Sequence, residues 1–300
     1  MLKPRHFPLL LLIICALSAS VTTQTGAQRI RVAVLDFGET GMGRLAPDKL
    51  TQALSLDDHL KMIDREESRA AAHGALYAGS LNLTLREARD LGGATGSDFY
   101  ITGDAQVLRR SPSTGPVYYE AYASIFIVSA RTGRLILWDR PSFNAASEEA
   151  AAEVLLNELK ARAARYAGAI GAARTSERDE RARILESAGE APAPVIEDAP
   201  EDEKVIARER LRLPQPYRRL RPAYPETAAR AEAEATVDVQ VEIDASGEVS
   251  RIEVVRWAGF GLDDAAVSAV RQLHFSPARR DGQAVPMRVL LRYNFRRPPK

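Results

Sequence analysis

The feature that most constrains this chain of 300 residues is an alternation of apolar and polar side chains near its C-terminus, over residues 237–243. A period of two is typical of a strand that buries only one face. The turn residues Ala245, Ser246 and Gly247 follow, and a second alternation runs over 251–254. The pattern therefore predicts a hairpin whose first strand has an apolar face consisting of Val237, Val239, Val241 and Ile243.

A helix and a third strand are predicted to follow the hairpin. Apolar residues recur at helical spacing over 262–273, and Asp263 and Asp264 fall in the first turn, where negative charge is favourable. A last alternation covers 287–295, with arginine and asparagine on its polar face. The C-terminal part of the chain is thus predicted to form a small ββαβ domain.

Short motifs occur in this unit in a fixed order. Tyr-Pro precedes the first strand, glycine ends the hairpin turn, LDxAA opens the helix, FxPA closes it, and DGxxVP leads into the last strand. This order resembles the C-terminal domain of TonB-family energy transducers, almost without gaps over 221–295. The motif residues are Tyr224, Pro225, Gly247, Leu262, Asp263, Ala266, Phe275, Pro277 and Gly282.

The resemblance implies that an extended segment of an outer-membrane receptor or transporter adds as a strand beside the last strand. The residues chosen for this role are Arg288, Val289, Leu290, Leu291, Arg292, Tyr293, Asn294 and Phe295. A sheet of three strands leaves an edge of unpaired N–H and C=O groups, which suits such an addition. The alternative is that the arginines only protect this edge from pairing with other strands, and that the edge binds no partner. Contact with inner-membrane motor proteins and pairing of the domain with itself stay open.

The composition describes an ordinary globular chain of about two domains. Hydrophobic residues make up 45% and charged residues 27% of the sequence, and the net charge is +1, which gives no argument for a nucleic-acid partner.

At the N-terminus, basic residues precede the apolar stretch PLLLLIICALSA, which is followed by small residues. Residues 1–27 are therefore predicted to be a signal peptide that exports the protein to the periplasm. The alternative is an uncleaved segment that anchors the protein in the membrane.

Residues 28–174 show a mixed α/β pattern. The nearly continuous apolar run IRVAVLDF predicts a buried strand. Thr84 and Glu87 form a capping box at the start of a helix that is expected to stop at Gly92-Gly93. Three strands should follow, the last two joined through Arg131-Thr132-Gly133, before an alanine-rich helix over about 145–173.

Several segments of this unit occur in an order that resembles the periplasmic CsgG/FlgO-type family and the N-terminal domain of TolB. These segments are VAVLDF, MIDREE, LGGATGSDFYITGDAQV and SARTGRLILW. The resemblance implies a small sheet with helices packed on it, used for docking or assembly rather than catalysis. The predicted fold class is therefore α+β, with this mixed α/β domain, a flexible linker and the TonB-like domain at residues 221–300.

The predicted linker covers residues 175–220, and its first part, SERDERARILESAGE, is alternatively an extension of the preceding helix. Its acidic, proline-containing part EAPAPVIEDAPEDE has no periodicity, which is typical of a flexible connection. An arginine-rich stretch follows it over 208–221. That stretch would either contact anionic lipid or cell-wall polymer, or form a solvated arm whose charge is balanced by the acidic linker.

No catalytic, metal-binding or cofactor-binding constellation is predicted. The loop GETGMGR has glycines at P-loop spacing, but Arg44 and Leu45 stand where lysine and serine or threonine would bind phosphate. Asp263 and Asp264 are adjacent and cannot share a proton on a helix. No ligand spacing relates His6, His59, His73 and His274, so no metal site is predicted. We assign His274 to capping of the C-terminal helix, because a cation is favourable at that end of the helix dipole.

Two functions follow from the sequence. The leading hypothesis is a non-enzymatic TonB-like envelope protein that supports energy-coupled transport through strand addition to its C-terminal domain. The alternative is a static periplasmic scaffold in cell-envelope assembly through which no energy passes.

Overall fold

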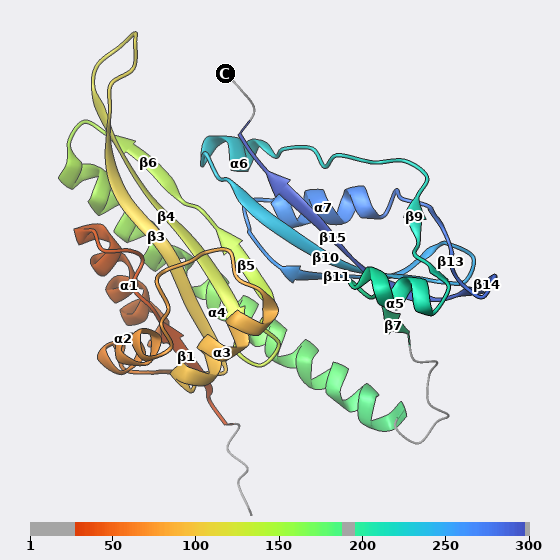
Figure 1. Ribbon diagram of the computed structural model, residues 1–300. Coiled ribbons are helices and arrows are strands. Elements are labelled where there is room, and N and C mark those ends of the chain that lie inside the picture. The colour runs from red at the N-terminus through yellow and green to blue at the C-terminus, as the bar shows by residue number, and fades with distance from the viewer. Residues whose placement is uncertain (1–27, 188–195, 298–300) are drawn as a thin grey trace, which may run out of the picture.

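The computed structural model describes residues 28–187 and 196–297 (Figure 1). The predicted signal peptide lies outside the described residues. Two separate mixed sheets, each with its own helices, confirm the α+β prediction. None of the described helices is long and apolar enough to cross a membrane.

The N-terminal sheet has the strand order β2-β1-β3-β4-β5, and β6 pairs with the opposite end of β4 from β5. β1 runs parallel to both of its neighbours, whereas β3, β4 and β5 are antiparallel. The predicted hairpin through Arg131-Thr132-Gly133 joins β4 to β5. The strands are β1 (Ile30–Val34), β2 (Leu60–Met62), β3 (Phe99–Arg110), β4 (Tyr118–Ser129), β5 (Leu135–Asp139) and β6 (Ser142–Ala145).

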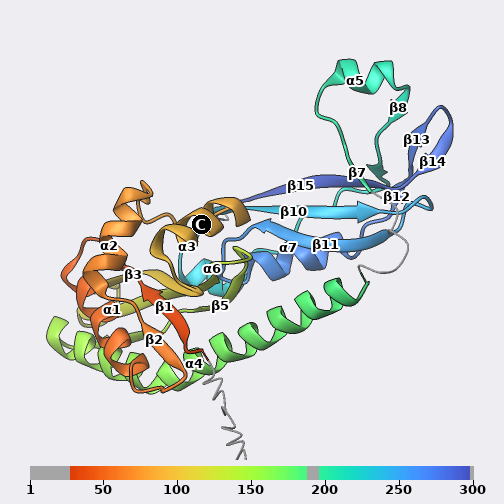
Figure 2. The same cartoon turned by 90° about the horizontal axis from the view of Figure 1, so that it is seen from below.

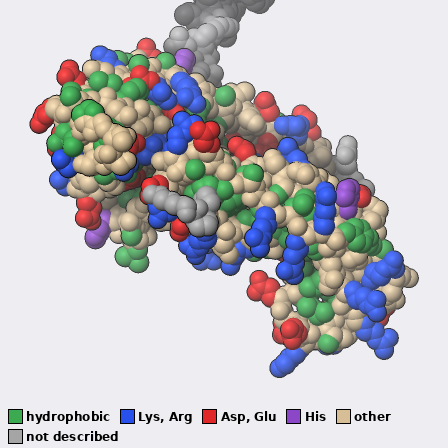
Figure 3. Space-filling view, turned by 90° about the horizontal axis from the view of Figure 1, so that it is seen from above, with side chains coloured by type: hydrophobic (Ala, Val, Ile, Leu, Met, Phe, Trp, Pro, Cys, Tyr) green, Lys and Arg blue, Asp and Glu red, His purple; other side chains and the backbone are tan. Residues whose placement is uncertain are grey.

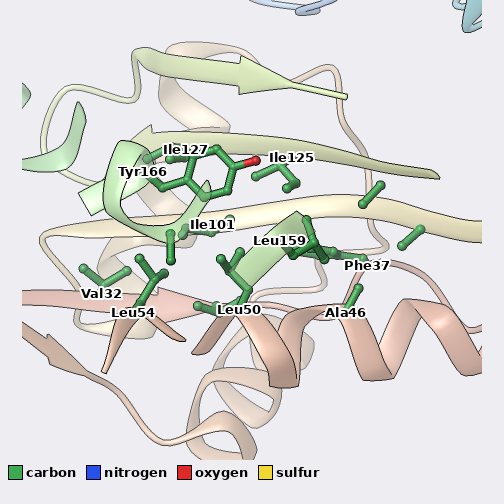
Figure 4. Packing of buried hydrophobic residues seen from close by; sticks show 14 of the residues in the cluster. Val32, Phe37, Ala46, Leu50, Leu54, Ile101, Ile125, Ile127, Leu159 and Tyr166 are labelled. Atoms are coloured by element: carbon green, nitrogen blue, oxygen red, sulfur yellow. The ribbon is translucent and has the colours of Figure 1, made fainter. Parts of the chain in front are cut away.

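Helices cover both faces of this sheet. α1 (Gly41–Leu54) and α4 (Glu148–Ser187) pack on one face, where Leu50, Leu159 and Tyr166 lie in a fully buried core (Figure 4). α2 (Arg65–Gly74) and α3 (Leu85–Thr95) flank the second core, on the opposite face. That second core also contains Trp257 from the C-terminal domain.

One helix end differs from the prediction. The capping box of α3 is present at Thr84 and Glu87, but the helix continues through Gly92-Gly93 and ends at the left-handed Gly96. α4 runs to Ser187, so most of the segment SERDERARILESAGE extends this helix, as one of its two predicted alternatives had it. The last turns of α4 extend towards the C-terminal domain (Figure 2). Before them, Glu177 and Glu180 bind side chains at the end of β4 and in the β4–β5 turn.

The C-terminal sheet has the order β11-β10-β15-β7, so the predicted hairpin and third strand are present with β10 between its partners. α7 (Leu262–Val270) packs on one face and contributes to a core formed mainly by alternate residues of β10. The strands are β7 (Glu197–Asp198), β10 (Ala235–Ile243), β11 (Val249–Arg256) and β15 (Met287–Phe295).

The segment between the domains is more ordered than its composition predicted. Its described part contains β7, α5 (Glu203–Arg208), β8 (Leu211–Arg212) and β9 (Gln215–Pro216). Leu211 is buried against Ala278 and Met287, so a few apolar side chains fasten this acidic stretch to the C-terminal domain. Short pairings complete this end of the molecule: β8 with β13 (Ala278–Arg280), β13 with β14 (Gln283–Val285), and β9 with β12 (Phe275–Ser276).

Candidate strand-binding edge

The last strand, β15, lies near one edge of the C-terminal sheet. Along its whole length one side pairs with β10. On the other side β7 pairs only with Met287 and Arg288. Among the described residues, no strand lies beside the outer edge of 289–295.

One hydrogen bond fixes which backbone groups face outward. The N–H of Ala199 donates to the carbonyl oxygen of Arg288 at 2.7 Å, on the side of β15 away from β10. In an antiparallel pair, residues alternate between exchanging both backbone bonds with the partner strand and exchanging none. Leu290, Arg292 and Asn294 therefore direct their N–H and C=O groups to the free edge, as Arg288 does to β7.

Side chains of β15 alternate between the two faces of the sheet. Val289, Leu291 and Tyr293 pack into the core beneath α7. On the open face Leu290 is 51% exposed, and Arg292 binds the buried carboxylate of Asp238 at 2.7 Å. The strand is therefore anchored by one face and by one row of backbone bonds, while the other row is free over 289–295.

The prediction of a wholly unpaired edge was wrong at its beginning. The sheet has a fourth strand, and β7 covers the outward groups of Arg288, one of the residues predicted to bind a partner. The cause is the tertiary packing of the inter-domain segment, which brings Glu197 and Asp198 beside β15. The remaining predicted partner-binding residues lie together along the free part of the edge.

Two motif aromatics, Tyr224 and Phe275, brace the sheet. The hydroxyl of Tyr224 donates to the carbonyl of Ala233 at 2.6 Å, just before β10. Phe275 is buried, and its N–H donates to the carbonyl of Gly247 in the hairpin turn at 3.0 Å. These contacts hold the ends of β10, and hence its pairing with β15.

The helical motif residues have structural positions as well. Leu262 and Ala266 are fully buried against the sheet. Asp263 accepts hydrogen bonds from the N–H groups of Ala258 and Gly259 at 2.9 and 2.8 Å. Burial raises the pKa of Asp263 to about 6 despite these two bonds.

The remaining motif residues lie in turns and at a helix start. Pro225 is the N-cap residue of α6 (Glu226–Arg230), and Pro277 follows β12. Gly247 and Gly282 both have positive φ angles, +94° and +86°. All the motif residues thus shape the domain around β15 rather than line its outer edge.

The opposite edge of the C-terminal sheet docks on the N-terminal domain. Trp257, directly after β11, is buried, stacks on Phe126 with ring centroids 5.8 Å apart, and donates its indole N–H to the carbonyl of Gly133 at 3.0 Å. The side-chain amide of Asn82 donates to the carbonyls of Thr236 and Trp257. The docking contact and the free edge of β15 therefore lie on opposite sides of the same sheet.

Sequence reasoning did not find this docking contact. Asn82 begins the sequence Asn-Leu-Thr, which matches a glycosylation sequon, but its amide forms hydrogen bonds between the domains. The one available signal was Trp257 itself, an aromatic residue placed just past an alternating strand. Nothing in a single sequence states which surface such a side chain covers.

Asp36 and His274, two polar residues outside the strand-binding edge, both contact oppositely charged or ionisable side chains. Partial burial alone would raise the pKa of Asp36, but hydrogen bonds from Arg69 and the charges of Arg65 and Arg69 hold it below its ordinary value. His274 lies beyond the end of α7, so it does not cap the helix as predicted, and its Nδ1 contacts Glu248 at 3.0 Å. In the described ranges no group of three or more potential metal ligands comes together.

The face of the molecule shown in Figure 3 differs in charge between the domains. Acidic and basic side chains are mixed over the N-terminal domain, whereas Lys and Arg side chains predominate over the C-terminal domain. Many arginines of this domain form ion pairs, as Arg288 does with Glu242 and Arg256 with Asp238.

Comparison with known proteins identifies the C-terminal domain. Residues 221–296 match the family model of the Gram-negative bacterial TonB protein C-terminal domain. The solution NMR structure of the TonB C-terminal domain from Pseudomonas aeruginosa is similar at 23% identity, covering 29% of this chain and 89% of that chain, with a TM-score of 0.26. The predicted TonB resemblance is confirmed for this domain.

The N-terminal domain has distant structural neighbours. The hypothetical protein CT253 from Chlamydia trachomatis is 13% identical and covers 48% of this chain and 99% of that chain, with a TM-score of 0.35. The LpoB C-terminal domain from Salmonella enterica is 11% identical and covers 38% of this chain and 82% of that chain, with a TM-score of 0.28. No protein with a curated description matches the sequence. The resemblance to the CsgG/FlgO-type family and TolB stays a prediction.

Proposed function

We propose that the C-terminal domain binds an extended segment of an outer-membrane receptor or transporter, which adds as a strand along the free edge of β15. The family match over 221–296 supports this class of partner. The protein would act in the periplasm, without catalysis, through backbone hydrogen bonds to its partner. Energy-coupled transport would then depend on tension transmitted through this backbone ladder.

The observation that carries the proposal is the unpaired outer edge of 289–295. Leu290, Arg292 and Asn294 direct backbone donors and acceptors outward, and β10 already holds the other side of the strand. Strand addition uses such an edge for affinity, while alternate side chains supply specificity. The edge is also rigid, because the opposite face of β15 is packed beneath α7.

Proline substitution tests the backbone bonds directly. Leu290→Pro and Arg292→Pro each remove an outward N–H that has no strand partner in the described structure, so the free domain should tolerate them better than Leu291→Pro, which removes a bond to β10. We expect each outward proline to weaken binding at least tenfold. The probes are synthetic peptides from periplasmic segments of outer-membrane transporters encoded in the same genome, measured by isothermal titration calorimetry.

Leu290→Ala is the matched control, because it shortens an exposed side chain and keeps the N–H. It should bind the same peptides within about twofold of the unchanged protein. Circular dichroism at each variant's binding temperature confirms that the fold is kept. Peptide affinity that survives proline at Leu290, Arg292 and Asn294 alike would rule out strand addition at this edge.

The second candidate function is a static envelope scaffold, and the packed domain interface favours it. Trp257 and Asn82 fasten the C-terminal domain to its neighbour, so the two domains can present one fixed surface. The two functions differ in anchoring. Mass spectrometry of the mature N-terminus separates them: retention of the N-terminal segment in the inner membrane supports transduction, whereas a start near Val21 or Gln28 supports the scaffold.

A further inference from the structure

The open face of the C-terminal sheet, away from α7, carries charges that alternate in sign from strand to strand. In the first column of this pattern, Glu242 of β10 lies in register between Arg251 of β11 and Arg288 of β15. Arg288 binds Glu242 at 2.8 Å on one side and Asp198 of β7 at 3.3 Å on the other. This column therefore ends with a carboxylate from the inter-domain segment.

The second column has the same order of charges, but in the described part of the chain no carboxylate binds its outer arginine from the side away from β10. Asp238 lies between Arg256 and Arg292, at 3.3 and 2.7 Å. Among the described residues no second carboxylate lies within ion-pair distance of Arg292, whose side chain is 58% exposed, against 29% for Arg288. Asp238 raises the pKa of Arg292 most, and the charge of Glu201, from the inter-domain segment, adds to this effect from farther away. A strand that continued past β7 would bring its own side chain to this position.

β7 ends because the chain turns away from the edge. Ala199 still donates its N–H to Arg288, and because alternate residues of a strand face the same neighbour, Glu201 would be the next donor. β7 ends at Asp198, before that residue. The contacts of β7 are also of a weak kind. Glu197 binds Arg280 and Asp198 binds Arg288, yet both carboxylates are more than half exposed, and exposed ion pairs contribute little.

We propose that β7 is an internal occupant of the partner-binding edge, and that an incoming strand displaces it to pair along the full length of β15. This inference rests on the proposed function and adds the chemistry of the partner: an extended segment that carries carboxylates on the face of Arg288 and Arg292. Displacement exchanges Asp198 for a carboxylate of the partner and fills the open position beside Arg292. The outward groups of Arg288 become available at the same time.

Ala199→Pro is the sharpest variant, because it deletes the N–H that bonds Arg288 and leaves every charge in place. The residue before it, Asp198, is already extended, as a residue preceding proline must be. Ala199→Gly is the matched control, since it keeps the N–H. The probes are two eight-residue peptides, one of alternating valine and glutamate and one of alternating valine and lysine, titrated at low salt into the full chain.

We expect Ala199→Pro to bind the valine-glutamate peptide about fivefold more tightly than the unchanged protein does, the factor expected when a competitor loses one net hydrogen bond. Ala199→Gly should bind within twofold of the unchanged protein. The valine-lysine peptide should bind at least tenfold more weakly to all three proteins. Hydrogen exchange at residues 196–198 should be faster in Ala199→Pro without any peptide, which reports release of β7 independently of binding.

The outcomes separate this inference from the proposed function. Equal affinity of Ala199→Pro and the unchanged protein for the valine-glutamate peptide overturns the role of β7 and leaves strand addition standing, provided that Leu290→Pro, which removes an outward N–H and no charge, still weakens binding at least tenfold. Equal affinity for both peptides overturns the assigned partner chemistry. Failure of both peptides to bind any of the proteins overturns strand addition and the inference together.

Discussion

Two motif glycines with similar backbone angles differ in what surrounds them. A Cβ at Gly247 would overlap the carbonyl oxygen of Phe275, whereas a Cβ at Gly282 would meet nothing within 4 Å. Both residues have φ in the left-handed region, which costs any other residue about 1 kcal/mol or more. Gly247 is therefore required both for the backbone conformation of its turn and for the close contact with Phe275, whereas Gly282 is required only for the conformation of its turn.

Substitution by alanine should separate these roles. We expect Gly247→Ala to lower the free energy of unfolding by about 3 kcal/mol or more, because the backbone of Phe275 must move. Gly282→Ala should cost only about 1 kcal/mol, from the positive φ. Urea unfolding of both variants under one set of conditions measures the difference, and equal losses would show that the contact with Phe275 is not tight.

The buried carboxyl of Asp263 should make stability depend on pH. Its native pKa of about 6 lies above the ordinary value of 3.8, so between these values the native state binds more protons than the unfolded state. The free energy of unfolding should therefore fall as the pH rises from about 4 to about 6, by up to about 3 kcal/mol at about 1.4 kcal/mol for each pKa unit. Below pH 4 this contribution is fully present.

Asp263→Asn tests the assignment, because the amide is close in shape to the protonated carboxyl and does not titrate. Urea unfolding at pH 4, 5, 6 and 7 should show a shallower decline in the variant than in the unchanged protein. Parallel pH profiles for the two proteins would mean that another group produces the dependence.

At the scale of elements, helix α3 shows why a predicted helix stop was wrong. Gly92 and Gly93 are weak helix formers, and propensity alone would end the helix there. The structure uses Gly92 for contact instead: a Cβ at this position would overlap Ala130, at the end of β4, while a Cβ at Gly93 would meet nothing within 4 Å. Tertiary packing has overridden local preference.

This difference gives opposite expectations for two adjacent residues. Gly93→Ala should raise the free energy of unfolding by about 0.5–1 kcal/mol, the gain in helix propensity at an unobstructed position. Gly92→Ala should lower it by about 1–3 kcal/mol, because the helix must move away from β4. Thermal unfolding of the two variants and the unchanged protein measures these changes in stability. Stabilisation by both substitutions would contradict the packing contact of Gly92 with Ala130.

Elements whose residues bury a regular face were predictable from sequence, and elements fixed by distant contacts were not. Apolar residues recur at every second position in β10 and at helical spacing in α7, so each pattern indicates one kind of element. The capping box of α3 is likewise a local signal. β7 has only two residues, both acidic, and lies beside β15 because the inter-domain segment that follows it packs through Leu211 on the C-terminal domain. The edge of β15 was therefore predictable, but its partial occupation was not.

At the scale of the whole molecule, the docking contact and the free edge of β15, where we propose that a partner binds, lie at opposite edges of one sheet. The N-terminal domain contacts the end of β11 through Trp257, while the free backbone groups lie on β15, beyond β10. A partner strand can therefore add without disturbing the domain interface. Force on that strand would pass across β10 to the Trp257 contact, which makes the strength of this contact decisive for transmission.

Truncation of Trp257 should uncouple the domains. Trp257→Ala removes a buried indole, its stacking on Phe126 and its bond to Gly133, which should cost about 3–5 kcal/mol. Small-angle X-ray scattering should then show a larger radius of gyration, and unfolding should separate into two transitions. Trp257→Phe keeps the stacking and loses one hydrogen bond, about 1 kcal/mol, so it should stay compact. A compact Trp257→Ala protein with a single transition would mean that the remaining contacts, led by Asn82, suffice to hold the domains together.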